Sequence, residues 1–408
     1  MSADRPPSQR SVHAQLNRRQ ALGLAAAVAV GSLATSAGRA TATAAGGLTT
    51  TWALPARSMG RQEPVWAAWL TDVIRRALVP TSIPGAIVGV WQDGQPPYVR
   101  AFGVQDTTTD QPMTPDLYMR IGSNTKSFTT TAILQLVDQG KIGLDDPIDK
   151  YVQGAPNGNR ITIRQLAGMR SGLFDYSTVT IPRWPGEPQR QWTAPELLAI
   201  AFGQPPIFEP DAEFDYNNTN TVLLGEIVEK VTGQSIRAYV NEHIVQPEGL
   251  THTFFPVGAE FPAPHSRGYW RTPDGALVDN TDWNFSWGDA AGQMVSTLDD
   301  LRIWARDLAT GTLLSPATQR EREKFLPAED EGQGVVYGLG MTDNNGWRGH
   351  DGNVLSQIAY PFYLPSQQMT LVVLLNSSID ALDSVAVMQA ITGVISPNNV
   401  WPNPPVSS

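Results

Sequence analysis

Two residues whose side chains can act together stand at the start of a helix-like run. Ser123 and Lys126 lie three positions apart in RIGSNTKSFT, where the apolar run YMRI gives way to TTTAILQLVDQG. Residues three apart share one face of a helix, so this spacing predicts the Ser123 hydroxyl beside the Lys126 amine. A serine hydroxyl becomes a nucleophile when a neighbouring base removes its proton. For this pair taken alone, an ordinary helix start with Lys126 in solvent is the alternative.

Two other short motifs can contribute to the same site. YNN places Tyr216 and Asn218 in a polar turn before a helix-like run, where side chains can converge on a cleft. HDG places His350 and Gly352 in a glycine-rich run next to a strand, where the backbone can approach a ligand closely. A second Tyr-x-Asn begins at Tyr239, but its surroundings have the spacing of a regular helix. Tyr216 is therefore the better candidate.

The elements that must position these residues come from both ends of the chain. EPVWAAWLTDVIRRAL predicts an amphipathic helix, and GAIVGVWQDG followed by PYVRAFGV predicts a β-hairpin. GVVYGLGMT, VLSQIAYPFYL and QMTLVVLLNSS predict strands, followed by a helix over about residues 379–394. The region from about 123 to 325 reads mostly as helices, with a capping box at Thr193 and Glu196. The sequence thus predicts an α/β fold, with a sheet built from both chain ends, flanking helices and a mostly helical inserted domain.

The first residues have the pattern of an export signal. LNRRQALGLAAAVAVGSLATSAGRATATAAGG combines Arg18 and Arg19 with a short apolar run and small residues at A-x-A spacing, which is typical of the twin-arginine route. The apolar run is shorter than the roughly 20 residues of a membrane-spanning helix, so we expect a secreted protein without stable membrane insertion. The expected divisions are a signal peptide at 1–44, a linker at 45–63, a catalytic domain at 64–396 and a proline-rich tail at 397–408.

Composition excludes several classes of function. The formal net charge of −10 argues against a nucleic-acid partner, because phosphate binding needs a basic surface. The 408 residues include no cysteine, which rules out disulfides, thiolate metal sites and a cysteine nucleophile. The phosphate-loop pattern and the histidine pair of zinc peptidases are absent from the sequence, so neither a cofactor nor a metal is implied.

The three motifs resemble those of the penicillin-recognising serine hydrolases, which include serine D-Ala-D-Ala carboxypeptidases, class C β-lactamases and related esterases. That superfamily has three signatures in fixed order, matched here by SNTK, YNN and HDG. The resemblance covers residues 64–395 and includes ITIRQLAGMRSGLFDY and the YGLG before GHDGN. It is greatest for the soluble actinomycete carboxypeptidases, which have His-x-Gly in the third motif. It implies a β-lactamase/transpeptidase-like fold with an antiparallel sheet.

The resemblance also implies catalytic roles. Ser123 would be the nucleophile and Lys126 its base, which must be neutral near pH 7. Tyr216 would return the proton to the leaving group, Asn218 would donate a hydrogen bond to the substrate amide carbonyl, and His350 would support Tyr216.

Substrate contacts are implied for three more residues. The family's oxyanion hole uses two backbone N–H groups, which correspond to Ser123 and Asn353. Gly352 belongs to the third motif, where the backbone approaches the ligand. Trp287 matches an aromatic residue that lines the cleft, and a core tryptophan is the alternative.

The chain departs from the carboxypeptidase pattern at the expected carboxylate site. Asp351 occupies the position where threonine is usual, and the residues just after YGLG include no arginine. A carboxylate substrate would meet a repulsion of about 1 to 4 kcal/mol there, unless Arg348 compensates from the adjacent strand.

The sequence therefore favours an exported serine hydrolase that acts through an acyl-enzyme on peptidoglycan-type D-Ala-D-Ala peptides. The alternatives are an esterase or a β-lactamase, which would take an ester or a β-lactam, and a non-catalytic cell-wall ligand-binding protein or sensor. The oligomeric state is left open.

Overall fold

The computed structural model describes residues 63–403 except 82, 273–274, 329–330, 333 and 379–380. The expected signal peptide, most of the expected linker and residues 404–408 lie outside this part of the chain. The strands are β1 Gly85–Gln92, β2 Tyr98–Asp106, β3 Gln111–Pro112, β4 Met119–Arg120, β5 Tyr269–Arg271, β6 Leu277–Asp279, β7 Val295–Ser296, β8 Leu326–Pro327, β9 Val335–Tyr337, β10 Thr342–Asn344, β11 Trp347–Gly349, β12 Gly352–Asn353, β13 Ile358–Leu364, β14 Met369–Leu375 and β15 Ser377–Ser378.

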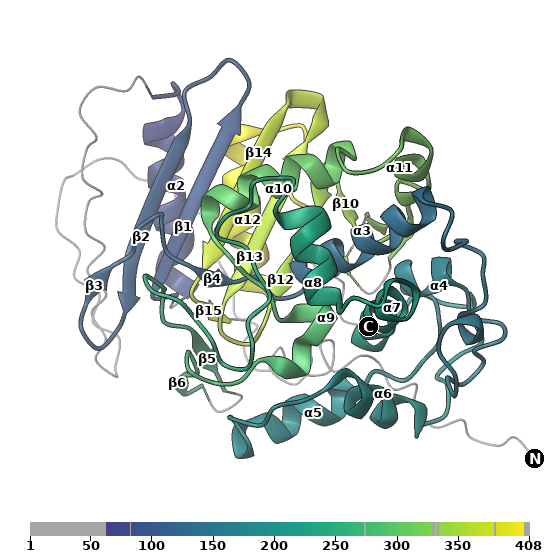
Figure 1. Ribbon diagram of the computed structural model, residues 1–408. Helices are drawn as coiled ribbons and strands as arrows, with labels where there is room; N and C mark the ends of the chain where they lie inside the picture. Colours follow the sequence, from purple (N-terminus) through teal and green to yellow (C-terminus); the bar gives the residue numbers. More distant parts are fainter. Residues whose placement is uncertain are drawn as a thin grey trace, which may run out of the picture.

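The helices lie in the inserted region and near the two ends of the described chain (Figure 1). They are α2 Ala67–Leu78, α3 Asn124–Asp138, α4 Ile163–Ala167, α5 Ser177–Arg183, α6 Ala194–Phe202, α7 Asn218–Thr232, α8 Ile236–Val240, α9 Asp289–Gly292, α10 Leu298–Thr310, α11 Pro316–Arg322 and α12 Ala381–Ile395. A π-helical turn at Asn241–Val245 extends α8, and short 3-10 turns lie elsewhere, among them Ser286–Gly288.

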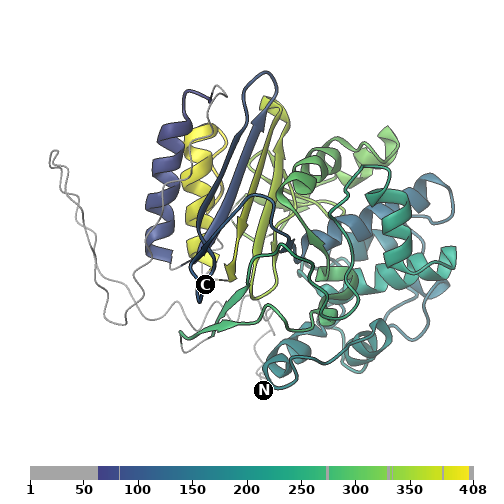
Figure 2. The ribbon, with the colours of Figure 1, turned by 60° about the vertical axis from the view of Figure 1, so that its left-hand side comes forward.

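Strands from the two ends of the chain form one antiparallel sheet, which confirms the predicted architecture. Among the described residues this sheet has ten strands, in the order β3-β2-β1-β14-β13-β11-β10-β9-β8, with β12 also paired to β13. The junction of the two ends is the pairing of β1 with β14, where Val88 lies opposite Val373. Both β13 and β14 are buried along their whole length, because helices cover both faces of the sheet (Figure 2).

Successive side chains of each central strand point into two different cores, one on each face of the sheet. Val88 and Val373 face α2 and α12, which pack against each other on one side of the sheet. Val372 and Leu374 point to the opposite face, where α10 and the inserted helices lie. This period of two places the larger core between the sheet and α3, the helix that follows Ser123.

Helix α3 is the central helix of the inserted region. Its residues from Asn124 to Leu134 are all buried. Phe128 stacks on Trp304 of α10 with ring centroids 3.9 Å apart, and the Trp304 indole N–H donates to the Ser127 hydroxyl at 2.9 Å. These contacts fix α3 against α10, which itself packs on β13 and β14. The start of α3 is therefore held against the sheet, where the Asn124 amide donates to the Ala359 carbonyl of β13 at 3.2 Å.

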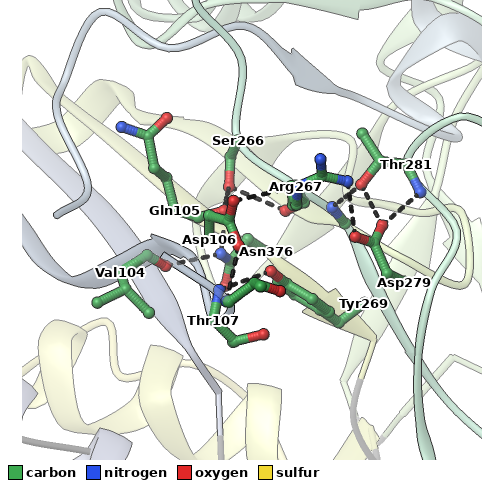
Figure 3. A network of polar contacts seen from close by, with 12 residues as sticks. Val104, Gln105, Asp106, Thr107, Ser266, Arg267, Tyr269, Asp279, Thr281 and Asn376 are labelled. Atoms are coloured by element: carbon green, nitrogen blue, oxygen red, sulfur yellow. Dashed lines mark hydrogen bonds and ion pairs between the residues drawn. The ribbon is translucent and has the colours of Figure 1, made fainter. Parts of the chain in front are cut away.

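A polar network connects the sheet to the strand before α3, and Figure 3 shows the part of it around Asn376 and Ser266. Asn376 is fully buried; its side-chain oxygen accepts from the Gly85 N–H at 2.7 Å, and its amide donates to the Ser266 hydroxyl at 3.1 Å. The Ser266 carbonyl accepts from Gln357, whose own side-chain oxygen accepts from the backbone N–H of Arg120 in β4 at 2.7 Å. Strand β4 is thus connected to the sheet three residues before Ser123.

Some element boundaries differ from the sequence prediction. The run GVVYGLGMT, predicted as one strand, forms β9 and β10 with a turn between them. A side chain at Gly338 would overlap the Arg322 carbonyl oxygen, and Gly340 has φ +67° and lies against Thr130. The two glycines allow the backbone to turn at this point, because a residue with a side chain would not fit there. The region 123–325, predicted as mostly helical, also contains β5, β6 and β7.

The start of the proline-rich tail packs on the sheet. Trp401 is buried, and its ring lies edge-on to Phe362 of β13 with centroids 4.7 Å apart. Its neighbour Tyr360 contacts the same indole. Residues up to 403 therefore belong to the folded part of the chain.

Candidate active site

Backbone packing presents the Ser123 side chain at the start of α3. Gly122 has φ +53°, and a side chain there would lie 2.9 Å from the Asn353 nitrogen. A side chain at Gly352 would overlap the Ile121 carbonyl oxygen. The turn before Ser123 and strand β12 therefore pack backbone against backbone, which only glycine permits. Ser123 itself is partly exposed, whereas the residues on either side of it are buried.

Lys126 is fully buried and makes three polar contacts. Its Nζ lies 3.0 Å from Ser123 Oγ, 2.7 Å from Asn218 Oδ1 and 2.9 Å from the Ala291 carbonyl oxygen in α9. The last two atoms can only accept hydrogen bonds. A neutral amine has two N–H groups and one lone pair, so these two acceptors take both N–H groups and leave the lone pair facing the Ser123 hydroxyl.

Burial favours this neutral state of the lysine. Burial lowers the pKa of Lys126 to about 7, partly opposed by the negative charges of Asp175, Asp351 and Glu331. A substantial fraction of the amine is then unprotonated near neutral pH, as a general base requires. The Ser123 hydroxyl and the Lys126 amine therefore lie side by side, as the spacing predicts, and their catalytic roles stay a prediction.

Tyr216 completes the contacts of this pair. It lies in the turn before α7, as the sequence predicts, and its side chain hydrogen-bonds with that of Ser123. Its ring centroid lies 4.7 Å from Lys126 Nζ. Burial raises the pKa of Tyr216 well above its usual value, so its hydroxyl keeps its proton. Tyr239, the alternative, lies in α8 against His243 instead.

Both ends of the Asn218 side-chain amide make hydrogen bonds within the protein, and its oxygen contacts Lys126. While its Oδ1 accepts from Lys126, its Nδ2 donates to Ser177 Oγ at 3.1 Å and to Asp175 Oδ2 at 3.4 Å. Both donors of the amide therefore have partners within the protein. In this arrangement the Asn218 amide is hydrogen-bonded within the protein, and its hydrogen bond to the substrate amide carbonyl stays a prediction.

His350 is buried behind Tyr216 and is held as one neutral tautomer. Its Nδ1 lies 2.6 Å from the Asp351 carbonyl oxygen, an acceptor, so Nδ1 carries the proton. Its Nε2 lies 3.1 Å from the Tyr337 hydroxyl, which therefore donates. Burial, with the nearby Lys126 charge, lowers the pKa of His350 to about 3. The ring lies 6.0 Å from that of Tyr216, between centroids.

The remaining predicted residues occupy different positions relative to Ser123. Gly352 and Asn353 form β12 directly beside the nucleophile turn, and the Asn353 side chain accepts from the Leu355 N–H at 2.8 Å. Trp287 is buried in the core, with its ring 5.4 Å from that of Trp184. It lies in the turn just before α9, which supplies the Ala291 carbonyl to Lys126.

The charges around the site are mostly negative. The Asp351 residue is partly exposed, and the loss of water around its carboxyl raises the pKa of that group. Arg348, the cation considered as a carboxylate partner, forms ion pairs at 3.3 Å with Glu323 and with Asp343. Its charge is therefore already compensated by Asp343 of the neighbouring strand β10 and by Glu323, which follows α11.

Sequence reasoning missed three contributors to the site. Tyr337 belongs to YGLG, which was noted only as part of a resemblance, and Asp175 and Ala291 had no motif of their own. Each contacts a residue that is not its neighbour in the chain: Tyr337 contacts His350, Asp175 contacts Asn218, and Ala291 contacts Lys126. Only the fold brings these pairs together. The flanking SGLFDY and YGLG runs were the available signals.

Metal and membrane features are absent from the described part of the chain. No group of three or more histidine, cysteine, aspartate or glutamate side chains is arranged there to hold a metal ion. None of the helices within residues 63–403, gaps excepted, is long and apolar enough to cross a membrane.

Solved structures with this architecture include a D-stereospecific amidohydrolase and a D-amino acid amidase. A D-stereospecific amidohydrolase from Streptomyces sp. is 29% identical, with a TM-score of 0.72 over 81% of this chain and 99% of that one. A D-amino acid amidase from Ochrobactrum anthropi SV3 is 27% identical, with a TM-score of 0.70 over 80% and 99% of the two chains. An octameric penicillin-binding protein homologue from Pyrococcus abyssi is 28% identical, with a TM-score of 0.70 over 82% and 79%.

Curated relatives are similar over a shorter share of their own length. Protein flp of Staphylococcus aureus (strain MW2) is 26% identical over 75% of this chain, which spans 62% of that protein. A D-aminopeptidase from Brucella anthropi is 27% identical over 72% of this chain and 56% of its own. The family model described as Beta-lactamase matches residues 70–389, most of the described domain. This chain therefore belongs to the Beta-lactamase family of serine hydrolases.

Proposed function

We propose that this protein is a serine amidohydrolase that forms an acyl-enzyme at Ser123 and cleaves amides or short peptides of D-amino acids. The observation that carries the proposal is the set of three contacts of Lys126: two are to acceptors, so a neutral amine has its lone pair left for the Ser123 hydroxyl. This is the geometry that a nucleophilic serine with a lysine base requires.

The first half of the reaction follows from these contacts. Lys126 takes the Ser123 proton as Oγ attacks the substrate carbonyl carbon, and an oxyanion forms. The backbone N–H groups of Ser123 and Asn353 are the proposed donors to that oxyanion, which the close packing of β12 on the nucleophile turn supports. Removing one such donor typically costs about 100-fold or more in rate.

Tyr216 is proposed to carry the proton to the leaving group. Its protonated phenol hydrogen-bonds with the Ser123 side chain and lies over the Lys126 amine. It gives its proton to the leaving amine as the C–N bond breaks, and it regains one from the Lys126 ammonium. Water then attacks the acyl-enzyme by the same route in reverse, which releases the acid and restores Ser123.

The charges around the site favour a substrate with a free amino group over one with a free carboxylate. Asp175, Asp351 and Glu331 all place negative charge near Lys126. Arg348 is already paired with two carboxylates, so it supplies little net positive charge to a substrate. Coulomb attraction therefore favours an α-ammonium group, which suits the D-amino acid amidase and D-aminopeptidase among the relatives.

A D-Ala-D-Ala carboxypeptidase is the second candidate. The three motifs and the similarity to a penicillin-binding protein homologue support it. It differs from the first proposal in the end of the substrate that the site must recognise, because a carboxypeptidase binds a free terminal carboxylate.

Hydrolysis by the purified protein lacking its leader separates these candidates. We expect D-alanine amide to be cleaved faster than L-alanine amide, and faster than a D-Ala-D-Ala peptide with a blocked amino end. Ser123→Ala should abolish each activity. D-alanine release from the blocked peptide alone would establish the carboxypeptidase. Cleavage of nitrophenyl esters or β-lactams without any amide would make the protein an esterase or a β-lactamase.

Export by the twin-arginine route is also proposed, on the basis of Arg18 and Arg19 in the leader. Replacing both arginines with lysine should keep the unprocessed chain inside the cell, which immunoblotting of cell fractions measures. Unchanged amounts of processed protein outside the cell would exclude this route.

A further inference from the structure

The orientation of one amide group decides where the Lys126 lone pair points. Asn218 presents its oxygen to Lys126 and its nitrogen to Asp175 and Ser177. If this amide turned over, its N–H groups would face the lysine, and the lone pair would be drawn to Asn218 instead of Ser123. The two orientations of the amide have nearly the same shape. The site therefore requires a group that holds the amide with its oxygen toward Lys126.

We infer that Asp175 is a positioning residue, whose carboxylate holds the Asn218 amide with its oxygen toward Lys126. The inference rests on the proposed function, because it assigns the group that prepares the base for the same reaction.

The Asp175 carboxylate favours one orientation of the Asn218 amide, because a carboxylate only accepts hydrogen bonds. Its Oδ2 lies 3.4 Å from Asn218 Nδ2, and an amide oxygen there would face a carboxylate oxygen. The Ser177 hydroxyl, 3.1 Å from the same nitrogen, can donate or accept and so allows either orientation. The orientation of the Asn218 amide is therefore set by Asp175.

Asp175 is itself fixed in place. It is buried, and its Oδ1 accepts from the Ser177 N–H at 2.9 Å at the start of α5. Its backbone carbonyl accepts from the Thr178 hydroxyl at 2.9 Å. A carboxylate held by a helix start cannot rotate to follow a turned amide, so Asn218 must adapt to it.

Asp175 also acts on the base through its charge. Its charge raises the pKa of Lys126, against the larger effect of burial. The ionisable groups that act on this lysine come from several elements: Asp175, Asp351 and Glu331 as carboxylates, and Ser123, Tyr216 and His350 as its neighbours. Asp175 is hydrogen-bonded to Asn218, which is itself a direct partner of the lysine.

Two variants separate positioning from mere support of the fold. Asp175→Asn places an N–H opposite Asn218 Nδ2 and so favours the turned amide. The double variant D175N/N218D exchanges the two groups: the introduced amide at 175 donates to the introduced carboxylate at 218, which still accepts from Lys126. Asp300→Asn is the matched control, because Asp300 is also buried and accepts from the Thr253 hydroxyl at 2.8 Å at the start of another helix.

The measurement is the rate at which a fluorophosphonate probe labels Ser123, followed from about pH 5 to about pH 9. In the wild type the rate should rise through the Lys126 pKa of about 7. Asp175→Asn should lower the maximal rate about 100-fold, because the base is wrongly oriented, and should move the rise to lower pH. The double variant should recover at least about tenfold of that loss and move the rise to higher pH, because a carboxylate then contacts the lysine. The control should keep the wild-type profile.

Two results would overturn the inference alone. One is a wild-type profile in Asp175→Asn, and the other is a double variant no faster than the single one while circular dichroism shows both folded. Failure of the wild-type protein to label at all would overturn the proposed function, and this inference with it.

Discussion

The Tyr337 hydroxyl donates to Nε2 of His350 across 3.1 Å, while His350 Nδ1 donates to the Asp351 carbonyl at 2.6 Å. Both ring nitrogens are thereby occupied. His350 cannot take a proton from Tyr216 in this state, and it supports the site as a neutral, fixed ring. The turn of YGLG positions Tyr337 because Gly338 and Gly340 pack against Arg322 and Thr130.

Removing the Tyr337 hydroxyl should affect both stability and rate. Tyr337→Phe leaves His350 Nε2 buried without a donor, which costs about 1 to 3 kcal/mol, and it frees the imidazole to turn. We expect kcat to fall about 10-fold, with a smaller change in KM. Steady-state kinetics and thermal unfolding measure the two effects.

Tyr269→Phe is the matched control for Tyr337→Phe. The Tyr269 hydroxyl accepts from the Thr107 N–H at 2.8 Å, within the polar network of Figure 3 and apart from Ser123. Its loss should lower Tm without changing kcat. If both variants lost stability and neither lost activity, Tyr337 would have no role in positioning His350.

The rate should depend on pH through the lysine and not through the histidine. Lys126 is active when unprotonated, so kcat/KM should fall as pH decreases below its pKa of about 7. His350 should add no second inflection between pH 5 and pH 7, because burial lowers its pKa to about 3. A pH profile from about pH 4 to about pH 9 tests this; an inflection near pH 6 that disappears in His350→Gln would show that the histidine titrates.

Lys126→Met should change the pH dependence of stability. Burial lowers the pKa of Lys126 to about 7 in the folded protein, whereas lysine in an unfolded chain titrates near about 10.4. Between these values the unfolded state binds more protons, so this group makes the free energy of unfolding rise with pH. The methionine variant lacks that contribution. The Tm of the wild type relative to the variant should therefore be higher at pH 10 than at pH 7; an equal difference would mean that the folded lysine titrates normally.

Two glycine substitutions should have opposite effects. Gly352→Ala introduces an overlap with the Ile121 carbonyl oxygen and should cost about 1 to 3 kcal/mol together with loss of Ser123 labelling. Gly393→Ala, within α12, adds a methyl group with no neighbour within 4 Å and should stabilise by about 0.5 to 1 kcal/mol. Chemical unfolding of both variants measures this. Equal stability of Gly352→Ala and the wild type would contradict the close packing of β12 on the nucleophile turn.

Local sequence patterns predicted the elements that carry the nucleophile. The helix-like run TTTAILQLVDQG after Ser123 belongs to α3, Asn124–Asp138, and the predicted capping box of Thr193 and Glu196 is present at α6. These features depend on residues a few positions apart, so spacing is sufficient. Glycine-rich YGLG was predicted as part of a strand because its turn depends on contacts with Arg322 and Thr130, which are far away in the chain.

The roles within the site were harder to predict for the same reason. Ser123 and Lys126 could be paired by helical spacing, and the structure places them 3.0 Å apart. The orientation of the Asn218 amide depends on Asp175, 43 residues earlier. Neither the direction of an amide nor the tautomer of His350 has a sequence signal, because both are set by partners that only the folded chain supplies.

The most direct test of the central claim is the intact mass of the protein without residues 1–44, after reaction with a fluorophosphonate probe, beside Ser123→Ala and Lys126→Met. We predict one adduct per chain in the wild type, mapped to the peptide that contains Ser123, with no adduct in Ser123→Ala and greatly slowed labelling in Lys126→Met. An unlabelled wild-type protein, or an adduct that persists in Ser123→Ala, would contradict the assignment of Ser123 as a nucleophile activated by Lys126.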